Sequence, residues 1–289
     1  MKWTASSSFR GLLRAALVEC ARNVLPPDEP EVLRALAGLG WRAENAIRHA
    51  RADAFLVEAR RLSGVGGLAA EALAREAQDV DLQRRLEELV LGRVEPQWLE
   101  RYAELSGVDP LDAPALYVAL GAPHPLVGVR ALAAVRPGLC ALHPASVEPP
   151  SASIADRWMH RRFTELRLRV PVLWATDVAA GSGALAEGRG VHAVITRARA
   201  GGAAGDIEEA ITGGAVLGLP LDRFLAQHSS APIRLVLVHR ERDKRWRVEI
   251  TPPVQTHEIA PKLAAHVRRW PGQHLPWLAA RVDGGEAPH

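Results

Sequence analysis

The sequence contains little cysteine, little lysine and no long apolar run. Its two cysteines, Cys20 and Cys140, cannot form a disulfide framework, and no Cys-x-x-Cys or Cys/His cluster has the spacing of a metal site. We therefore expect no structural metal, and we predict a cytoplasmic protein. No stretch approaches the roughly eighteen apolar residues that a membrane-spanning helix needs, and no signal-peptide core follows Lys2. The sequence predicts neither a spanning helix nor secretion.

The basic residues are nearly all arginine. Lysine and arginine together number 36 against 33 acidic residues, so the formal net charge is only +3. Aromatic residues make up 5% of the chain, and the arginines lie mostly in mixed-charge helical segments rather than on a basic strip interleaved with aromatics. Nucleic-acid binding is therefore the weakest functional interpretation, and we expect no nucleic-acid partner.

Helical patterns dominate residues 1–110. Apolar residues recur at helical spacing from Arg10 to Leu25, which predicts an amphipathic helix that either lies on a membrane surface or packs on the protein's own core. Further helices are predicted over 31–62 and 68–91, the second ending at Gly92. Most charges of the 68–91 helix are expected to form a solvated face.

After Pro110 the pattern changes to short apolar runs that alternate with helical segments. Such alternation predicts a mostly parallel, doubly wound α/β sheet with helices on both faces. The predicted strands are 115–120, 138–142, 170–175, 191–196 and 233–239, and the predicted helices are 127–135, 154–169, 180–187 and 219–227. Residues 245–250 follow a turn and alternate apolar with charged residues, which predicts a hairpin-like edge strand with one exposed face. We expect a helical N-terminal region, 1–110, and an α/β region, 111–289, within one continuous domain.

The carboxyl ends of parallel strands are where such sheets bind ligands. The loops after the predicted strands contain histidines, an acid and arginines, a combination that suits a general base acting beside an anionic group. These candidate residues are His124, His143, Glu148, Arg197, Arg199 and Arg240. No Gly-x-x-x-x-Gly-Lys-Ser/Thr sequence is present, and no Gly-x-Gly-x-x-Gly joins a strand to a helix, so nucleotide binding of either familiar kind is disfavoured.

The C-terminal half carries an order of motifs that resembles a known family. The motifs are Ala184–Gly202, then Gly218-Leu219-Pro220, then Ser230–Arg240 with its Ser-Ala-Pro opening, then Trp246–Pro253 with its closing Pro-Pro, and the tryptophan-containing tail Pro271–Arg281. This order is similar to that of the late acyltransferases of bacterial lipid A biosynthesis. The resemblance covers about Pro114 to Arg281.

The resemblance implies a lysophospholipid-acyltransferase-like α/β fold. Such a protein moves a fatty or polyketide acyl chain from an acyl-carrier-protein or CoA thioester to a hydroxyl of a lipid or other amphiphile, on the inner face of the inner membrane and without a bound cofactor. Family members share a histidine, four residues and an acid: the imidazole removes the hydroxyl proton, and the carboxylate orients the ring. In register with the family, however, Gly121 stands at the histidine position and Leu126 at the acid position.

Two interpretations of this departure remain open. In the first, the protein is an active acyltransferase whose base is His143, supported by Glu148, or else His124. The candidate arginines would then hold a phosphate of the acceptor or of the carrier. In the second, the protein is a catalytically inactive relative that acts as an acyl-binding or partner subunit. The expected partners are an acyl carrier protein or acyl-CoA, a lipid acceptor or membrane surface, and a partner protein, with no metal.

Overall fold

The computed structural model describes ten parts of the chain. They are residues 20, 23–37, 55–61, 67–107, 114–144, 168–175, 179–196, 207–216, 219–227 and 230–278, without the side chains of Trp98, His143, Pro144, Trp174 and Ala175. The helices predicted over 10–25 and 154–169 fall almost wholly outside the described residues, as does the middle of the helix predicted over 31–62.

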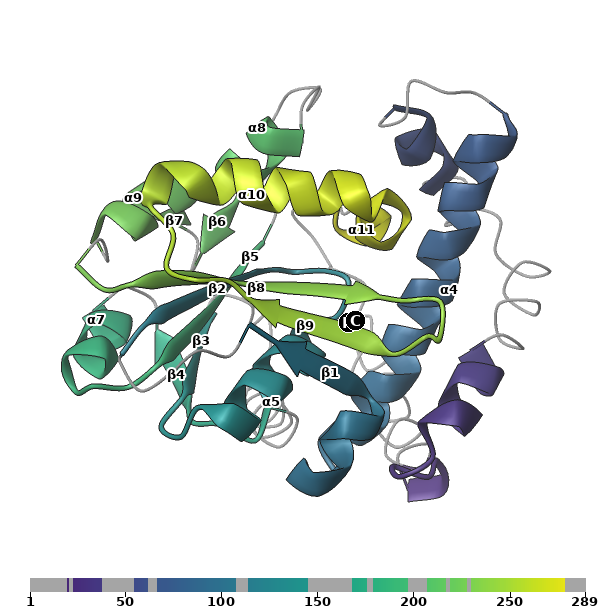
Figure 1. Ribbon diagram of the computed structural model, residues 1–289, viewed down its shortest axis with the longest axis horizontal. Helices are drawn as coiled ribbons and strands as arrows, with labels where there is room; N and C mark the ends of the chain where they lie inside the picture. The colour runs from purple at the N-terminus through teal and green to yellow at the C-terminus, as the bar shows by residue number, and fades with distance from the viewer. Residues whose placement is uncertain are drawn as a thin grey trace, which may run out of the picture.

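A seven-stranded, mostly parallel sheet forms the centre of the described part of the chain (Figure 1). Its strands are β1 (Ala103–Ser106), β2 (Leu116–Leu120), β3 (Cys140–Pro144), β4 (Val172–Ala175), β5 (Val191–Ile195), β8 (Ile233–Arg240) and β9 (Trp246–Ile250). The spatial order is β1-β9-β8-β2-β5-β3-β4. Strands β8, β2, β5, β3 and β4 are parallel, whereas β9 is antiparallel to β8 and parallel to β1. The predicted α/β class and mostly parallel sheet are confirmed.

Helices cover both faces of this sheet. The elements are α4 (Leu68–Leu91), the 3₁₀ helix η1 (Pro96–Arg101), α5 (Pro125–Val135), α7 (Ala179–Ala186), α8 (Ile207–Thr212), α9 (Leu221–Gln227), α10 (Thr256–Arg269) and α11 (Pro271–Leu278), with a small pair of strands, β6 (Ala215–Val216) and β7 (Leu219–Pro220). Figure 1 shows α10 across one face and α5 on the other. Among the described residues, no helix is both long enough and apolar enough to cross a membrane.

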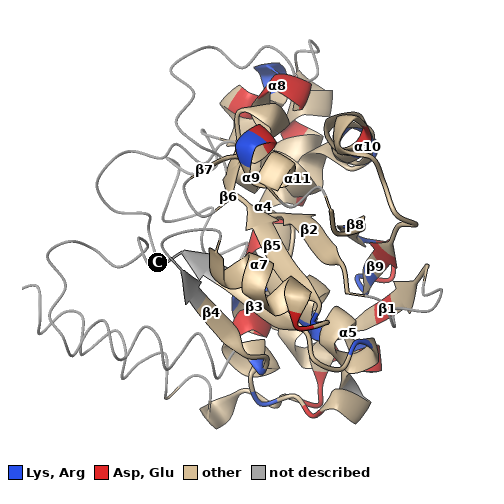
Figure 2. Cartoon of the chain, turned by 90° about the vertical axis from the view of Figure 1, so that its left-hand side faces the viewer, with Lys and Arg blue, Asp and Glu red and all other residues tan. Residues whose placement is uncertain are grey.

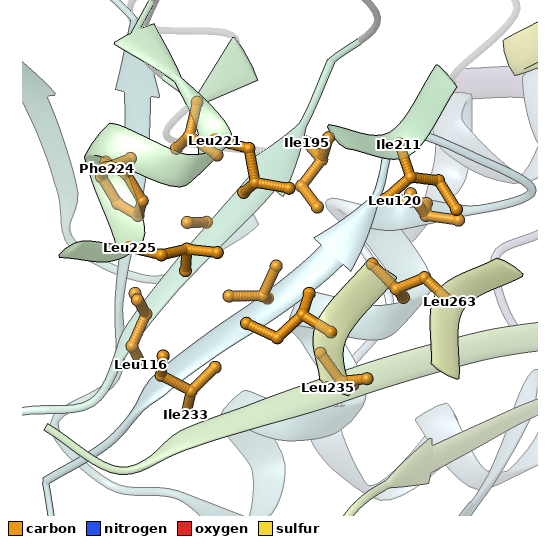
Figure 3. Packing of buried hydrophobic residues seen from close by; sticks show 14 of the residues in the cluster. Leu116, Leu120, Ile195, Ile211, Leu221, Phe224, Leu225, Ile233, Leu235 and Leu263 are labelled. Atoms are coloured by element: carbon orange, nitrogen blue, oxygen red, sulfur yellow. The ribbon is translucent and has the colours of Figure 1, made fainter. Parts of the chain in front are cut away.

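Alternation along β2 divides the core between the two faces. Leu116, Val118 and Leu120 pack with residues of α7 to α11, whereas Tyr117 and Ala119 pack with α5, α4 and η1. Figure 3 shows the first set, in which leucines and isoleucines of β2, β5 and β8 meet side chains of α9 and α10. Each such side chain stabilises the fold by about 1.5–3 kcal/mol when fully buried. The carboxyl ends of the central strands are therefore held by core packing on both faces.

Helix α4 has the predicted ends but not the predicted surface. It begins at Leu68 and ends at Leu91, with Gly92 at its C-cap. The prediction that its charges are mostly solvated is wrong for Glu87, which is buried; Asp81, on the same helix, is also buried. Glu87 is buried because α4 packs beside the β8–β9 hairpin (Figure 1), where this carboxylate accepts a hydrogen bond from Nε1 of Trp246, while Val80 and Leu91 of the same helix pack in the apolar core.

Strand β1 changes the expected position of β9. Residues 103–106 pair with β9 in parallel, from Ala103 opposite Trp246 to Ser106 opposite Glu249. The predicted edge strand therefore lies inside the sheet, and β1 forms the edge. Residues of the region 1–110 thus contribute both a strand and a packing helix to the α/β sheet.

Charged residues are rare among the central strands and frequent on the helices and turns around them. Figure 2 shows this from the side: the strands are mostly tan, and acidic and basic positions gather around α8 and α9, near α5 and on the connecting turns. Several buried polar groups lie at the carboxyl ends of β2 and β8, among them His124 and Arg240. These ends form the candidate site.

Candidate functional site

The topology of the sheet marks one crevice as the expected ligand position. After β2 the chain enters α5 on one face, whereas after β5 it enters α8 and α9 on the opposite face. Strands β2 and β5 are neighbours and are parallel. Where the connections of two adjacent parallel strands leave toward opposite faces, a crevice opens between their carboxyl ends, and ligands bind there in open α/β sheets. In this chain the crevice expected from the topology lies between Gly121 and Thr196, which directly follow β2 and β5.

The indole of Trp277 occupies that crevice. Its Nε1 donates a hydrogen bond to the carbonyl oxygen of Ile195 at 3.2 Å, and the backbone N–H of Gly121 donates to the same oxygen at 3.1 Å. A Cβ atom added at Gly121 would lie 3.2 Å from Cδ1 of the indole. Trp277 is only 5% exposed. The crevice is therefore filled by a side chain of α11, and Gly121 is the residue that leaves room for it.

The two positions of the expected His/acid dyad carry no ionisable group. Gly121 directly follows β2, and Leu126 lies in the first turn of α5, where it is 4% exposed and packs in the apolar core. Neither residue can accept a proton from a hydroxyl. The position at which the resembled family has its histidine, Gly121, therefore lies at the switch point of the sheet and carries no base.

His124 lies three residues further on, at the N-cap of α5. It is fully buried, and its Nδ1 accepts a hydrogen bond from the backbone N–H of Val127 at 3.4 Å. A neutral ring that accepts at Nδ1 carries its proton on Nε2. That atom lies 3.4 Å from Oε2 of Glu87, close but not aligned for a good hydrogen bond. Both ring nitrogens therefore face protein groups, and the ring caps the helix and contacts Trp246 edge-on with centroids 5.0 Å apart.

Glu87 forms the centre of a buried polar network at this end of the sheet. One oxygen accepts a hydrogen bond from Nε2 of Gln83 at 2.8 Å, and the other accepts from Nε1 of Trp246 at 2.5 Å and faces His124. The carboxylate is fully buried. Burial of a carboxylate is unfavourable unless donors replace its water shell, and here two nitrogen donors, one from α4 and one from β9, do so, while Nε2 of His124 faces the same carboxylate. The network fastens α4 to the strand ends.

Arg240, a candidate anion-binding residue, belongs to the same network. Its Nη2 pairs with Asp79 at 2.7 Å, and its Nη1 donates to Oε1 of Gln83 at 2.8 Å. The side chain of Gln273 accepts from the backbone N–H of Arg240 and donates to its carbonyl oxygen. Arg240 is 8% exposed. In this structure its guanidinium is thus neutralised by Asp79 and ties the end of β8 to α4, while its backbone ties the same strand end to α11.

The other candidates are placed only in part. His143 lies in β3 with its backbone opposite Trp174 of β4, and its side chain falls outside the description. Glu148, Arg197 and Arg199 lie outside the described residues. Their roles stay predictions. Strands β3 and β5 are neighbours in the sheet, paired in parallel through Cys140–Val191 and Ala141–His192.

A second group of histidines was not singled out as a cluster by the sequence. His239 at the end of β8, His266 in α10 and His274 in α11 form a row with ring centroids 5.6 and 5.2 Å apart, and Trp270 stacks on His239 at 4.6 Å. Burial and the neighbouring His266 lower the pKa of His239 to about 4. Burial also lowers the pKa of His266 and, more strongly, that of His274. These rings are neutral near pH 7. Only the tertiary fold brings them together.

The row of histidines is a packing feature rather than a ligand set. His266 has its Nε2 3.0 Å from the carbonyl oxygen of Val238, and among the described residues neither ring nitrogen of His274 has a hydrogen-bond partner. Within the described residues, no group of three or more His, Cys, Asp or Glu side chains has an arrangement that could hold a metal ion.

Comparison with known proteins assigns no family to the chain. No protein-family model matches the chain, and no curated protein matches it significantly.

Proposed function

We propose that this protein is an acyltransferase-like protein that binds an acyl thioester without transferring the acyl chain, and that it serves as an acyl-binding or partner subunit. The observation that carries the proposal is the packing of Trp277 against Gly121 at the switch point of the sheet. Acyl transfer to a hydroxyl needs a base within hydrogen-bond reach of that hydroxyl. At this position the chain offers a glycine and an indole N–H, which is a donor only.

The resemblance to the lipid A acyltransferases supports the acyl part of this proposal. Its motifs lie in α7, β5, β8, β9 and α11. The three strands belong to one sheet, and residues of α7, β5, β8 and α11 pack in one apolar cluster. A scaffold that keeps these elements and loses the dyad is expected to keep a surface for the acyl donor. The proposed partners are an acyl carrier protein or CoA thioester, and the proposed location is the inner face of the inner membrane.

Active acyl transfer is the second candidate function, and one observation favours it. Strands β3 and β5 are adjacent and parallel; His143 lies near the end of β3 and Glu148 comes after it in the sequence, whereas Arg197 and Arg199 come after β5. A base on the first segment and an anion-binding pair on the second would suit a thioester donor with a phosphate-bearing arm. In this version the chemistry lies one strand away from its position in the resembled family.

Equilibrium binding separates acyl recognition from mere binding of the carrier. Long-chain acyl-CoA and acyl-carrier protein are titrated into the full chain and compared with CoA and with carrier protein that lacks the acyl group. The proposal predicts that the acylated forms bind at least about tenfold tighter, because apolar chain burial contributes about 0.8 kcal/mol per methylene. Equal affinity for acylated and unacylated forms would remove the acyl-binding function.

A further inference from the structure

Helix α11 carries both the indole that fills the switch-point crevice and a buried histidine. Trp277 lies in the crevice, and His274 lies three residues earlier in the same helix. Figure 1 shows α11 directly after α10 and beside α4, and α11 contacts both helices. Because less than one helical turn separates the two side chains, a displacement of α11 that uncovers His274 also withdraws the indole.

The position of His274 suits a neutral ring and not a charged one. The residue is 1% exposed, and among the described residues neither ring nitrogen has a hydrogen-bond partner. Its ring contacts His266 of α10, which in turn contacts His239 of β8; we call these three rings the histidine row. Burial and the two neighbouring imidazoles lower the pKa of His274 well below 6.5. A proton on this ring would be a buried charge without an acceptor, which is strongly unfavourable.

Two carboxylates and one guanidinium act on the outer part of the row. Glu241, after β8, is exposed and has its Oε1 3.8 Å from Nε2 of His239. Glu249 of β9 favours the charged form of His266, whereas Arg269 of α10 disfavours the charged form of both rings. Burial outweighs the two carboxylates, so the pKa of His239 is lowered to about 4 and that of His266 is lowered as well.

The acids of α4 that lie nearest to α11 already have partners. Glu76 accepts a hydrogen bond from Nε2 of Gln273 at 3.1 Å, and Asp79 pairs with Arg240. Gln273 also bonds to both backbone groups of Arg240. These contacts hold α11 on the end of β8 while the row is neutral, and they leave no acceptor for His274 among the described residues.

We propose that the histidine row is a proton-sensitive latch whose protonation releases α11 and withdraws Trp277 from the switch-point crevice. Withdrawal leaves the carbonyl oxygen of Ile195 paired, because the backbone N–H of Gly121 donates to it as well. The open crevice then admits the ligand. The inference rests on the proposed function only for the identity of that ligand, an acyl thioester.

The sign of the pH dependence follows from the lowered pKa values. A ring that α11 uncovers takes up a proton near its ordinary pKa of 6.5, whereas the closed row resists protonation until a much lower pH. The stability of the closed form is therefore complete above pH 6.5 and declines as the pH falls below it. The ratio of open to closed helix should rise about tenfold between pH 6 and pH 5 for each ring that opening uncovers.

Amide hydrogen exchange of the full chain between pH 7 and pH 5, corrected for the intrinsic exchange rate, measures this opening. In the wild type the protection of the α11 amides should fall by at least about tenfold between pH 6 and pH 5. His274→Leu and His274→Gln remove one titrating ring, so each should make this fall about tenfold smaller. A role of His274 in packing alone would change the protection at every pH equally.

His192→Gln is the matched control. His192 is also buried, with a pKa lowered to about 4, but it does not share the face of α11: its neighbours Val191 and Ala193 pack in the cluster of α10 and α11, so its own side chain lies on the opposite face of β5. This variant should leave the pH dependence of α11 protection unchanged. Protection of α11 that does not vary with pH, that varies equally in both His274 variants, or that follows His192→Gln would overturn the latch.

Binding of long-chain acyl-CoA relative to CoA, at pH 7.0 and pH 5.5, connects the latch to the crevice. The acyl-dependent part of the affinity should rise about tenfold at the lower pH in the wild type, because the binding-competent population rises, and by less than about twofold in His274→Leu. Exchange as predicted without acyl binding at either pH would remove the proposed function and leave the latch. Acyl binding with pH-independent protection of α11 would remove the latch and leave the proposed function.

Discussion

Replacing Gly121 by alanine should destabilise the protein only while Trp277 is present. The new Cβ would lie 3.2 Å from the indole Cδ1 and 3.4 Å from the carbonyl oxygen of Ile195. The indole cannot move away without giving up its hydrogen bond to that same oxygen. Overpacking of this kind typically costs about 1–3 kcal/mol. We therefore expect Gly121→Ala to lower the free energy of unfolding by that amount in the wild type.

The same change should be neutral or stabilising in Trp277→Ala. Truncation of a tryptophan that is 5% exposed should itself cost about 3–5 kcal/mol. Once the indole is gone, the alanine Cβ has room, and the smaller conformational freedom of alanine in the unfolded chain is worth about 0.4–1 kcal/mol. The double-mutant cycle should give a coupling free energy of at least about 1 kcal/mol, with a reversal of sign for Gly121→Ala.

Urea unfolding of the four proteins at pH 7 measures this cycle. Gly183→Ala in α7 is the control, because nothing lies within 4 Å of its added Cβ. It should be stabilising by about 0.5–1 kcal/mol in both backgrounds. An effect of Gly121→Ala that is the same with and without Trp277, within about 0.5 kcal/mol, would refute the claim that the indole fills the switch point.

Two further predictions concern buried ionisable groups. Glu87→Ala should destabilise the protein by about 3–5 kcal/mol, because it leaves buried nitrogen donors without an acceptor. Glu71→Ala breaks only a surface pair and should cost less than about 1 kcal/mol. Equal losses of unfolding free energy for the two variants in urea would contradict the network around Glu87. Burial lowers the pKa of His192 from 6.5 to about 4, so the unfolded chain takes up this proton near pH 6.5 and the folded chain only near pH 4. Acidification from pH 7 to 5 should therefore remove about 2 kcal/mol of stability that His192→Gln does not lose; identical pH profiles of the wild type and this variant would refute the assignment.

Much of the fold follows from sequence patterns that act locally. The 68–91 helix was predicted to the residue because an apolar-periodic segment is closed by Gly92, and the strands of the α/β region were located because central parallel strands are continuous apolar runs. Strand β1 escaped prediction, since Ala103–Ser106 is short and only half apolar. Its place is fixed by pairing with β9 rather than by its own composition.

The candidate site was predictable only at its strand ends. His124 and Arg240 were expected at the carboxyl edge, and they do follow or end the adjacent strands β2 and β8. Their partners Glu87 and Asp79 could not be foreseen, because charges on an amphipathic helix are assigned to solvent unless the tertiary packing is known. The same holds for Trp277, whose contact with Gly121 joins distant parts of the chain.

The most direct test of the central claim is single-turnover acyl transfer under conditions where acyl ligand is bound. Labelled acyl-carrier protein and acyl-CoA are mixed with excess protein, and release of the thioester and appearance of acylated product are followed for the wild type, His143→Ala and His124→Ala. We predict bound acyl ligand and no transfer or hydrolysis above the uncatalysed background in any of the three. Turnover by the wild type that His143→Ala reduces by about a hundredfold, as expected for removal of a general base, would contradict it and establish an enzyme with a relocated histidine.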